Sequence, residues 1–473
     1  MEDLDVMLMP PTLDVQQTID AAPLSVLQRK AIAMTMVIVF FDGVDALIMA
    51  ITAPSIAKEW GITTASMTPA IIASLLGMIL GGILLAPRAD RYGRRPVLIA
   101  GVVIFAALTL VASAAQSLEQ LAALRFFAGI GLGAVVSNGF AYGAEFAPQR
   151  MRATVVTMIG ASAAAGAFIC GLLASAIIPS MGWRFVFILG GALPLLLVPA
   201  LLRWLPETVQ FLTIKGRQQA ALSLLRSIDV RTVDSSSGVL SIESFSKGEK
   251  PSIKLLFAAR FAPITLLFCV IYFAAVLLMY FLLSWIPSVL TDAGFSTGQA
   301  VFASSVCNLG AMIGGITLGT RIDRSKSPYR ILSFAFLVAA IAIVVTAFSL
   351  GSLVVLMTSL LFVGAFSTGT QMGVNAVTTD IYPAWLRATG VGFLTSVGRF
   401  GSVVGPSIGG ALLAAQLPAK TIFLLAVIPA IVAASGMAAL GVVVTSRRRG
   451  QVLQEQAEAC TEDRVALSLD KEL

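Results

Sequence analysis

The segment GMILGGILL at residues 77–85 recurs as GAMIGGITL at residues 310–318, an offset of 233 residues. An Asp-Arg dipeptide follows each copy at the same distance. A second pair of similar segments, EFAPQRMRAT at 145–154 and DIYPAWLRAT at 380–389, lies at almost the same offset. Self-similarity at a constant offset is typical of a fold built from repeated units. The sequence therefore predicts two halves with the same internal plan.

The apolar content of the chain is far above that of soluble domains. Apolar residues make up 57% of the 473 residues, charged residues only 12%, and the mean hydropathy is +0.91. A bilayer-spanning helix needs about 20 mostly apolar residues, and about a dozen such segments follow one another here. We expect twelve transmembrane helices, at approximately 31–53, 68–88, 95–115, 119–144, 152–178, 184–204, 262–288, 299–320, 330–349, 352–378, 388–413 and 420–444.

These segments predict an all-α polytopic membrane protein made of two pseudo-symmetric six-helix bundles. Two related bundles of this kind are the plan of a secondary transporter. The expected divisions are an N-terminal tail at 1–30, a first bundle at 31–205, a polar linker at 206–260, a second bundle at 261–445 and a C-terminal tail at 446–473.

Lys and Arg in the short loops gather on one side of the predicted membrane. They are Arg91, Arg94, Arg95, Arg150, Arg152, Arg321, Arg324, Lys326, Arg330 and Arg447 to Arg449. Because basic loops stay in the cytoplasm, both termini, the linker and these loops are expected there. The net charge of +7 is thereby a topology signal, and we expect no nucleic-acid partner.

The chain lacks the residues of common catalytic and metal sites. It contains no histidine, and its four cysteines stand singly, without CxxC spacing. Histidine-dependent nucleophilic catalysis and the usual zinc and haem ligation are therefore excluded. We expect no enzyme activity, no metal and no cofactor.

Two aspartates, Asp42 and Asp45, stand close to the middle of the first predicted span. Charged groups at that depth are costly unless they pair, take up a proton or face a water-filled cavity, so they indicate function. A spacing of three puts both carboxyl groups on one helix face. Burial and mutual repulsion favour protonation of such a pair, which is why we expect it to couple transport to a proton gradient. Alternatively, a hydrogen-bonded pair holds this helix to its neighbours.

An arginine, Arg399, lies about twelve residues into the eleventh predicted span, among glycines. A guanidinium stays charged and binds a carboxylate through two parallel hydrogen bonds, so Arg399 suits a substrate acid. Asp42 or Asp45 is its expected partner at rest. The alternative is a permanent structural salt bridge. Arg125 in the fourth span is a weaker candidate, for proton relay or for bracing its helix.

The loop segment APRADRYGRR at 86–95 resembles the signature of the major facilitator superfamily, and the repeat resembles that family's two halves. The resemblance covers the whole chain and implies a loop latch that holds the bundles together while the inner side is closed. The implied latch residues are Asp90, Arg91, Gly93, Arg94, Arg95, Glu145, Arg152, Asp323, Arg324, Asp380 and Arg387. Alternatively, these charges only anchor helices among lipid headgroups.

Four short motifs narrow the resemblance within that superfamily. They are DGVD at 42–45, RFFAGIGLG at 125–133, SWIP at 284–287 and GRFG at 398–401. Together they look like the aromatic acid:proton symporters, which import benzoate-like and hydroxybenzoate-like anions across the bacterial inner membrane. The resemblance implies Asp42 and Asp45 for proton coupling, and Arg125 and Arg399 for handling the substrate charge.

We therefore expect a proton-coupled transporter that imports aromatic carboxylates by alternating access, with the proton gradient as its driving force. It is expected to be a monomer in the lipid bilayer of the bacterial inner membrane. The substrate site should lie where the halves meet, because the acids belong to the first half and Arg399 to the second. Alternatives are a carrier of non-aromatic organic anions, a drug efflux antiporter and a non-transporting membrane sensor.

Overall fold

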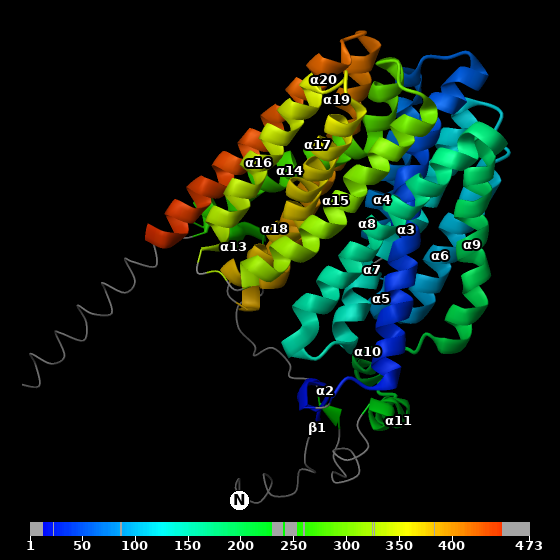
Figure 1. Cartoon of the computed structure of the whole chain (residues 1–473). Helices are drawn as coiled ribbons and strands as arrows, with labels where there is room; N and C mark the ends of the chain where they lie inside the picture. The colour runs from blue at the N-terminus through cyan, green and yellow to red at the C-terminus, as the bar shows by residue number, and fades with distance from the viewer. Residues whose placement is uncertain are drawn as a thin grey trace, which may run out of the picture.

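The computed structural model describes residues 13–21, 23–85, 88–228, 240–241, 253–258, 261–323, 325, 327–382 and 384–446. Long helices dominate this part of the chain (Figure 1), and the predicted all-α membrane fold is confirmed. Eleven helical segments among these residues are long and apolar enough to cross a membrane. A twelfth long helix, α19, spans Ala384–Ala414.

The first half contains α3 (Val26–Trp60), η2 (Thr64–Met67), α4 (Thr68–Leu84), α5 (Arg88–Tyr92), α6 (Arg94–Ala112), α7 (Leu118–Phe146), α8 (Gln149–Met181) and α9 (Trp183–Trp204). The second half contains α14 (Ala262–Asp292), α15 (Thr297–Asp323), α16 (Pro328–Phe348), α17 (Leu353–Phe366), α18 (Thr368–Ile381), α19 and a span Ala419–Ser446 that begins with α20 (Ala419–Leu425). Shorter elements are β1 (Leu13–Asp14), α2 (Val15–Ala21), α10 (Val209–Ile214), α11 (Gln218–Ile228), β2 (Leu240–Ser241) and α13 (Ile253–Leu256).

Several helices are longer than the apolar runs that predict them, as α3 illustrates. Its apolar run was placed at 31–53, but the helix spans Val26–Trp60. Ser25 and Gln28 form a capping box at its start, with Gln28 N donating to Ser25 Oγ at 3.2 Å. Gly61, with φ of 66°, ends it in the left-handed region. Caps decide where the helix ends, because they satisfy the terminal backbone groups that the helix leaves open.

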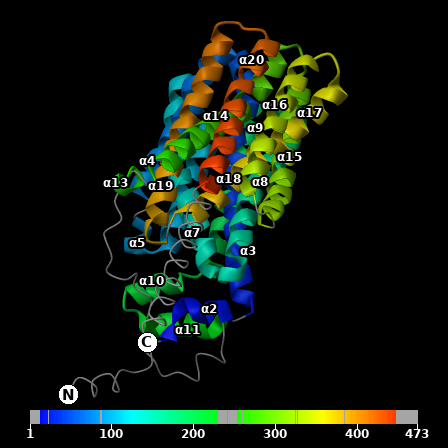
Figure 2. The ribbon, with the colours of Figure 1, turned by 90° about the vertical axis from the view of Figure 1, so that its left-hand side faces the viewer.

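The helices α2, α10 and α11 lie together at one end of the molecule, which we call the linker end (Figures 1 and 2). They share a small apolar core that includes Ile19, Leu212 and Leu225. β1 pairs in parallel with β2 beside them. The helix-like start of the linker therefore forms real helices, whereas most of its serine-rich remainder lies outside the described residues.

Three buried apolar clusters show how the halves meet. At the end opposite the linker, which we call the far end, one cluster spans both halves and packs residues such as Leu47 and Ile51 with Trp285 and Val289. Toward the linker end each half has a separate cluster, around Phe105 in the first and around Phe268, Tyr272 and Leu332 in the second. The halves are therefore packed together at the far end and keep separate cores at the linker end.

The repeated glycines let pairs of helices touch through their backbones. A Cβ atom on Gly77 of α4 would stand 2.0 Å from the carbonyl oxygen of Phe126 in α7. The equivalent Cβ on Gly310 of α15 would stand 2.0 Å from the carbonyl oxygen of Leu361 in α17. Small residues permit such close helix packing in membranes, which explains why the repeat preserves these positions.

We expect Gly77→Ala and Gly310→Ala each to destabilise the fold by about 1–3 kcal/mol, because the helices must move apart to admit a methyl group. Thermal unfolding of the purified protein in detergent measures the effect. Gly351→Ala is the matched control, since nothing lies within 4 Å of a Cβ atom there. Equal unfolding temperatures for all three variants would contradict the prediction.

Candidate functional site

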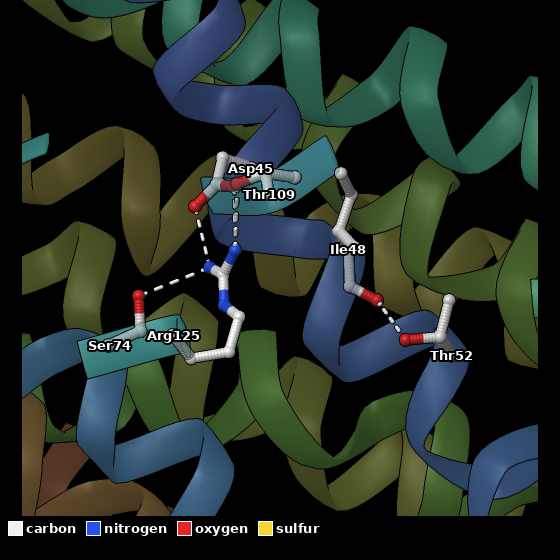
Figure 3. A network of polar contacts seen from close by, with 6 residues as sticks. All are labelled: Asp45, Ile48, Thr52, Ser74, Thr109 and Arg125. Atoms are coloured by element: carbon white, nitrogen blue, oxygen red, sulfur yellow. Dashed lines mark hydrogen bonds and ion pairs between the residues drawn. The ribbon is translucent and has the colours of Figure 1, made fainter. Parts of the chain in front are cut away.

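Asp45 of α3 and Arg125 of α7 form a bidentate ion pair inside the first half (Figure 3). Arg125 Nη1 donates to Asp45 Oδ1 at 2.8 Å, and Nη2 donates to Oδ2 at 2.6 Å. Both side chains are 1% exposed. Thr109 of α6 donates to Asp45 Oδ1 at 2.8 Å, and Arg125 Nη2 donates to Ser74 Oγ of α4 at 3.1 Å. One buried pair thus joins four helices.

A cavity of about 110 Å³ adjoins this pair, between α3, α4, α7 and α14. Ser74 and Arg125 line it, with apolar side chains such as Met49 and Leu132. The second half contributes residues of α14, among them Tyr280 and Ser284. The cavity therefore lies where the two halves meet.

Asp42 also lines this cavity, and it is half-buried. Within the described residues it has no hydrogen bond and no ion pair. Three residues turn an α-helix by about 300°, so the two aspartates point about 60° apart on α3. That rotation is enough to aim Asp45 into the helix packing of the first half and Asp42 into the cavity. The two acids, grouped as one pair by their spacing, therefore have different surroundings.

Arg399 of α19 reaches across to the first half. Its Nη2 donates to Ser137 Oγ of α7 at 3.1 Å. Its guanidinium lies against Gly82 of α4, where a Cβ atom would stand 2.2 Å from Nη1. The expected ion pair with an aspartate is absent among the described residues, because Arg125 holds Asp45 and Asp42 stays unpaired.

Among the aromatic side chains near the predicted charges, Tyr280 is the one that lines the cavity. Phe127 and Phe400 are 54% and 67% exposed, as expected for side chains that face lipid. Phe281 is buried in the core that joins the halves, and Tyr272 hydrogen-bonds Thr378 within the second half. Tyr280 is therefore the aromatic residue with direct access to a bound molecule.

Among the residues of the predicted latch, those whose side chains the structure describes all belong to the first half. Arg94 pairs with Glu145, and Arg95 donates to the carbonyl oxygen of Leu202. Arg91 stacks on Tyr92. Gly93 has φ of 109°, and Arg152 Nε is buried without a hydrogen-bond partner. The side chains of Asp90, Asp323, Asp380 and Arg387, and the whole of Arg324, lie outside the described residues.

Glu207, three residues after α9, contacts two residues of the predicted latch, and the sequence analysis missed it. Its Oε1 accepts hydrogen bonds from the backbone N–H groups of Arg94 at 3.0 Å and Arg95 at 3.3 Å. A carboxylate at a helix N-terminus satisfies open N–H groups and stabilises the positive end of the dipole. The signal in the sequence is an acid three residues after the sixth predicted span, but its place at the start of the polar linker hides it.

The described residues contain no group of three or more His, Cys, Asp or Glu that could hold a metal ion. The polar groups that line the cavity are the carboxyl group of Asp42, the guanidinium group of Arg125, the phenol of Tyr280 and two serine hydroxyls, and Asp45 and Arg399 lie next to it. Such a set can bind an anion, exchange a proton and donate hydrogen bonds to a small polar ring.

Comparison with known proteins identifies the family. The sequence profile of the Major Facilitator Superfamily matches residues 34–361 and 326–468. The chain belongs to the Major Facilitator Superfamily. It is 32% identical over 433 residues to the 4-hydroxybenzoate transporter PcaK of Pseudomonas putida, covering 91% of this chain and 96% of PcaK. The predicted family is confirmed, and with it the prediction that the protein is a transporter rather than an enzyme.

Two further comparisons agree with this assignment. The gallate transporter of Pseudomonas putida is 34% identical, covering 92% of this chain and 97% of that protein. The fold is similar to that of a bacterial homologue of the human lysosomal transporter Spinster, solved in an inward-facing and unoccupied conformation. That comparison has a TM-score of 0.66 and 16% sequence identity, and covers 88% of this chain and 97% of the other.

Removal of Arg125 would leave Asp45 as an uncompensated buried carboxylate. We expect Arg125→Met to destabilise the protein by about 3–5 kcal/mol, and the double variant Asp45→Leu/Arg125→Met by clearly less. Thermal unfolding in detergent compares the two.

A matched control is Arg184→Met at the Arg184–Glu59 pair, whose side chains are each 41% exposed. Exposed pairs contribute about 0–1 kcal/mol, so this change should have little effect. A double variant as unstable as Arg125→Met would contradict the assignment of the loss to an unpaired charge.

Proposed function

We propose that this transporter imports aromatic carboxylates together with protons, by alternating access. The observation that carries the proposal is the arrangement of charges at the inter-half cavity: Asp42 faces it without a partner among the described residues, whereas Asp45 is neutralised by Arg125. The relatives named for 4-hydroxybenzoate and gallate transport support the substrate class. The proton gradient is the driving force, and no cofactor is needed.

Asp42 is the proposed proton-coupling group. A carboxyl group can change its charge during transport only if a fixed cation does not hold it ionised. Asp45 is held by two hydrogen bonds from Arg125 and one from Thr109. Asp42 has no such partner among the described residues and borders the cavity. In this proposal Asp45 and Arg125 keep fixed charges, and they support proton coupling by holding α3 in place next to Asp42.

The cavity and Arg399 together suit an aromatic acid. A dry cavity of about 150 Å³ binds benzene in another protein, so this cavity, at about 110 Å³, is smaller than that and has to widen when an aromatic acid binds. Tyr280 offers an aromatic face and a hydroxyl. Arg399, near the linker end of the cavity, supplies the cation that a substrate carboxylate requires.

The packing of the halves supports alternating access. A shared core closes the far end, while the halves have separate cores toward the linker end. If the basic loops and both termini are cytoplasmic, as their charge predicts, this arrangement faces the cytoplasm. The Spinster homologue, similar in fold, was solved inward-facing. Formation of the loop latch would then accompany closure of the cytoplasmic side. We place the protein, as a monomer, in the bacterial inner membrane.

Asp42→Asn should abolish accumulation of labelled 4-hydroxybenzoate under an inward proton gradient in liposomes. It should retain counterflow exchange, because exchange requires no net proton movement. Asp292→Asn is the control: Asp292 is an exposed acid at the end of α14, away from this cavity. Full gradient-driven accumulation by Asp42→Asn would contradict the role proposed for Asp42.

Substrate class is tested by counterflow against a panel of benzoates, dicarboxylates, sugars and cationic drugs. We expect monocyclic aromatic carboxylates to drive exchange and the other compounds not to. Because a bidentate carboxylate contact is lost, Arg399→Gln should raise the KM for 4-hydroxybenzoate by about tenfold or more. Exchange driven by dicarboxylates or drugs instead of benzoates would assign the protein to one of the alternative carrier classes.

A further inference from the structure

The position of Arg399 depends on the absence of a side chain at Gly82. An ideal Cβ atom on Gly82 would lie 2.2 Å from Nη1, 3.1 Å from Cζ and 3.3 Å from Nη2 of Arg399. Cβ atoms do not approach other heavy atoms to 2.2 Å, so any other residue here would displace the guanidinium. Gly82 therefore provides a recess in α4 that the planar end of Arg399 fills.

The partner of Arg399 in this recess is neutral. Ser137 Oγ accepts one hydrogen bond from Nη2, at 3.1 Å, whereas a guanidinium offers five N–H donors. No carboxylate oxygen lies within 4.0 Å of Arg399 in the part of the chain that the structure describes. The cation is thus held by one hydrogen bond to a neutral group, and within the described residues no acid occupies its remaining donors.

The recess adjoins the cavity on the side of the linker end. Met78, one helical turn before Gly82 on α4, lines the cavity, as does Val136 beside Ser137 on α7. Arg399 itself comes from α19 of the opposite half. Its guanidinium therefore stands next to the cavity, on the side toward which the halves have separate cores, and crosses from one half to the other.

We propose that Gly82 and Ser137 form a resting socket for the Arg399 guanidinium, from which a substrate carboxylate withdraws it. The proposal rests on the function proposed above and adds two positioning residues to the substrate site. A neutral hydroxyl is suited to this task because it orients the cation without neutralising it. A bidentate carboxylate forms stronger hydrogen bonds than Ser137 does, so the substrate outcompetes the socket.

The two halves differ at this position, although the repeat preserves the glycine. A Cβ on Gly315, the equivalent of Gly82, would meet Sδ of Met372 at 2.5 Å. Met372 belongs to α18 of the same half and is flexible and uncharged. Gly315 therefore supports packing within its half, whereas Gly82 supports a contact between the halves. This difference provides a matched control.

Ser137→Asp tests the socket through substrate binding. A carboxylate at this position would pair permanently with Arg399, so we expect the Kd of 4-hydroxybenzoate, measured by calorimetry in detergent, to rise by about tenfold or more. Gly82→Ala should raise the Kd as well, because its methyl group would displace the guanidinium from its place beside the cavity. Gly315→Ala should leave the Kd unchanged. Ser137→Ala removes only the weak contact and should not raise the Kd. Unchanged binding in both Ser137→Asp and Gly82→Ala, with folding confirmed by gel filtration, would overturn the proposal.

A second measurement needs no substrate. With Cys170, Cys269, Cys307 and Cys460 replaced by Ala, the single thiol of Ser137→Cys should be alkylated by N-ethylmaleimide several-fold faster than in the Ser137→Cys/Arg399→Gln protein. The reason is that a neighbouring guanidinium favours the reactive thiolate. Added 4-hydroxybenzoate should slow the reaction toward the rate of the double variant.

These outcomes separate the socket from the proposed function. Fast alkylation that depends on Arg399, in a protein that neither binds nor transports aromatic acids, would support the socket and refute the substrate class. Equal alkylation rates with and without Arg399, in a protein that does transport 4-hydroxybenzoate, would refute the socket and leave the proposed function in place.

Discussion

A buried carboxylate in a membrane helix must be neutralised, and the Asp45–Arg125 pair meets that requirement in the first half. The pair brings together α3 and α7, and its hydrogen bonds to Thr109 and Ser74 add α6 and α4. Because removing one charge would leave the other buried without a partner, the pair helps to hold these four helices together. The second half has no counterpart, since Ala275 and Leu278 occupy the equivalent positions.

Because of this asymmetry, the residues that pack the helices together differ from the charged residues at the cavity. The repeat supplies matching helices and matching glycine contacts, such as Gly77 with α7 and Gly310 with α17. The charges are distributed unevenly over this frame: the first half holds the Asp45–Arg125 pair and Asp42, which has no partner among the described residues, and the second half contributes Arg399. The cavity forms where these contributions meet.

Much of the fold could be predicted from the sequence, because a span of the bilayer requires a long apolar run and the repeat is recognised by comparing the sequence with itself. The charged residues of the site were accessible for the same reason, since Asp42, Asp45, Arg125 and Arg399 interrupt apolar segments. Their partners were not. Arg399 was expected to pair with an aspartate, but its contact is Ser137, a residue with no distinguishing mark in the sequence. Glu207 was overlooked because it begins a polar linker.

The sequence by itself determined the number and order of the helices, the two related halves and the residues whose charge demands an explanation in a membrane. These are local properties of composition and spacing. Only the tertiary structure decided which charges meet, because pairing depends on how each helix is rotated and how closely its neighbours approach. A difference of about 60° around α3 directs Asp45 to a buried arginine and leaves Asp42 at the cavity. A single missing side chain, at Gly82, decides where Arg399 rests.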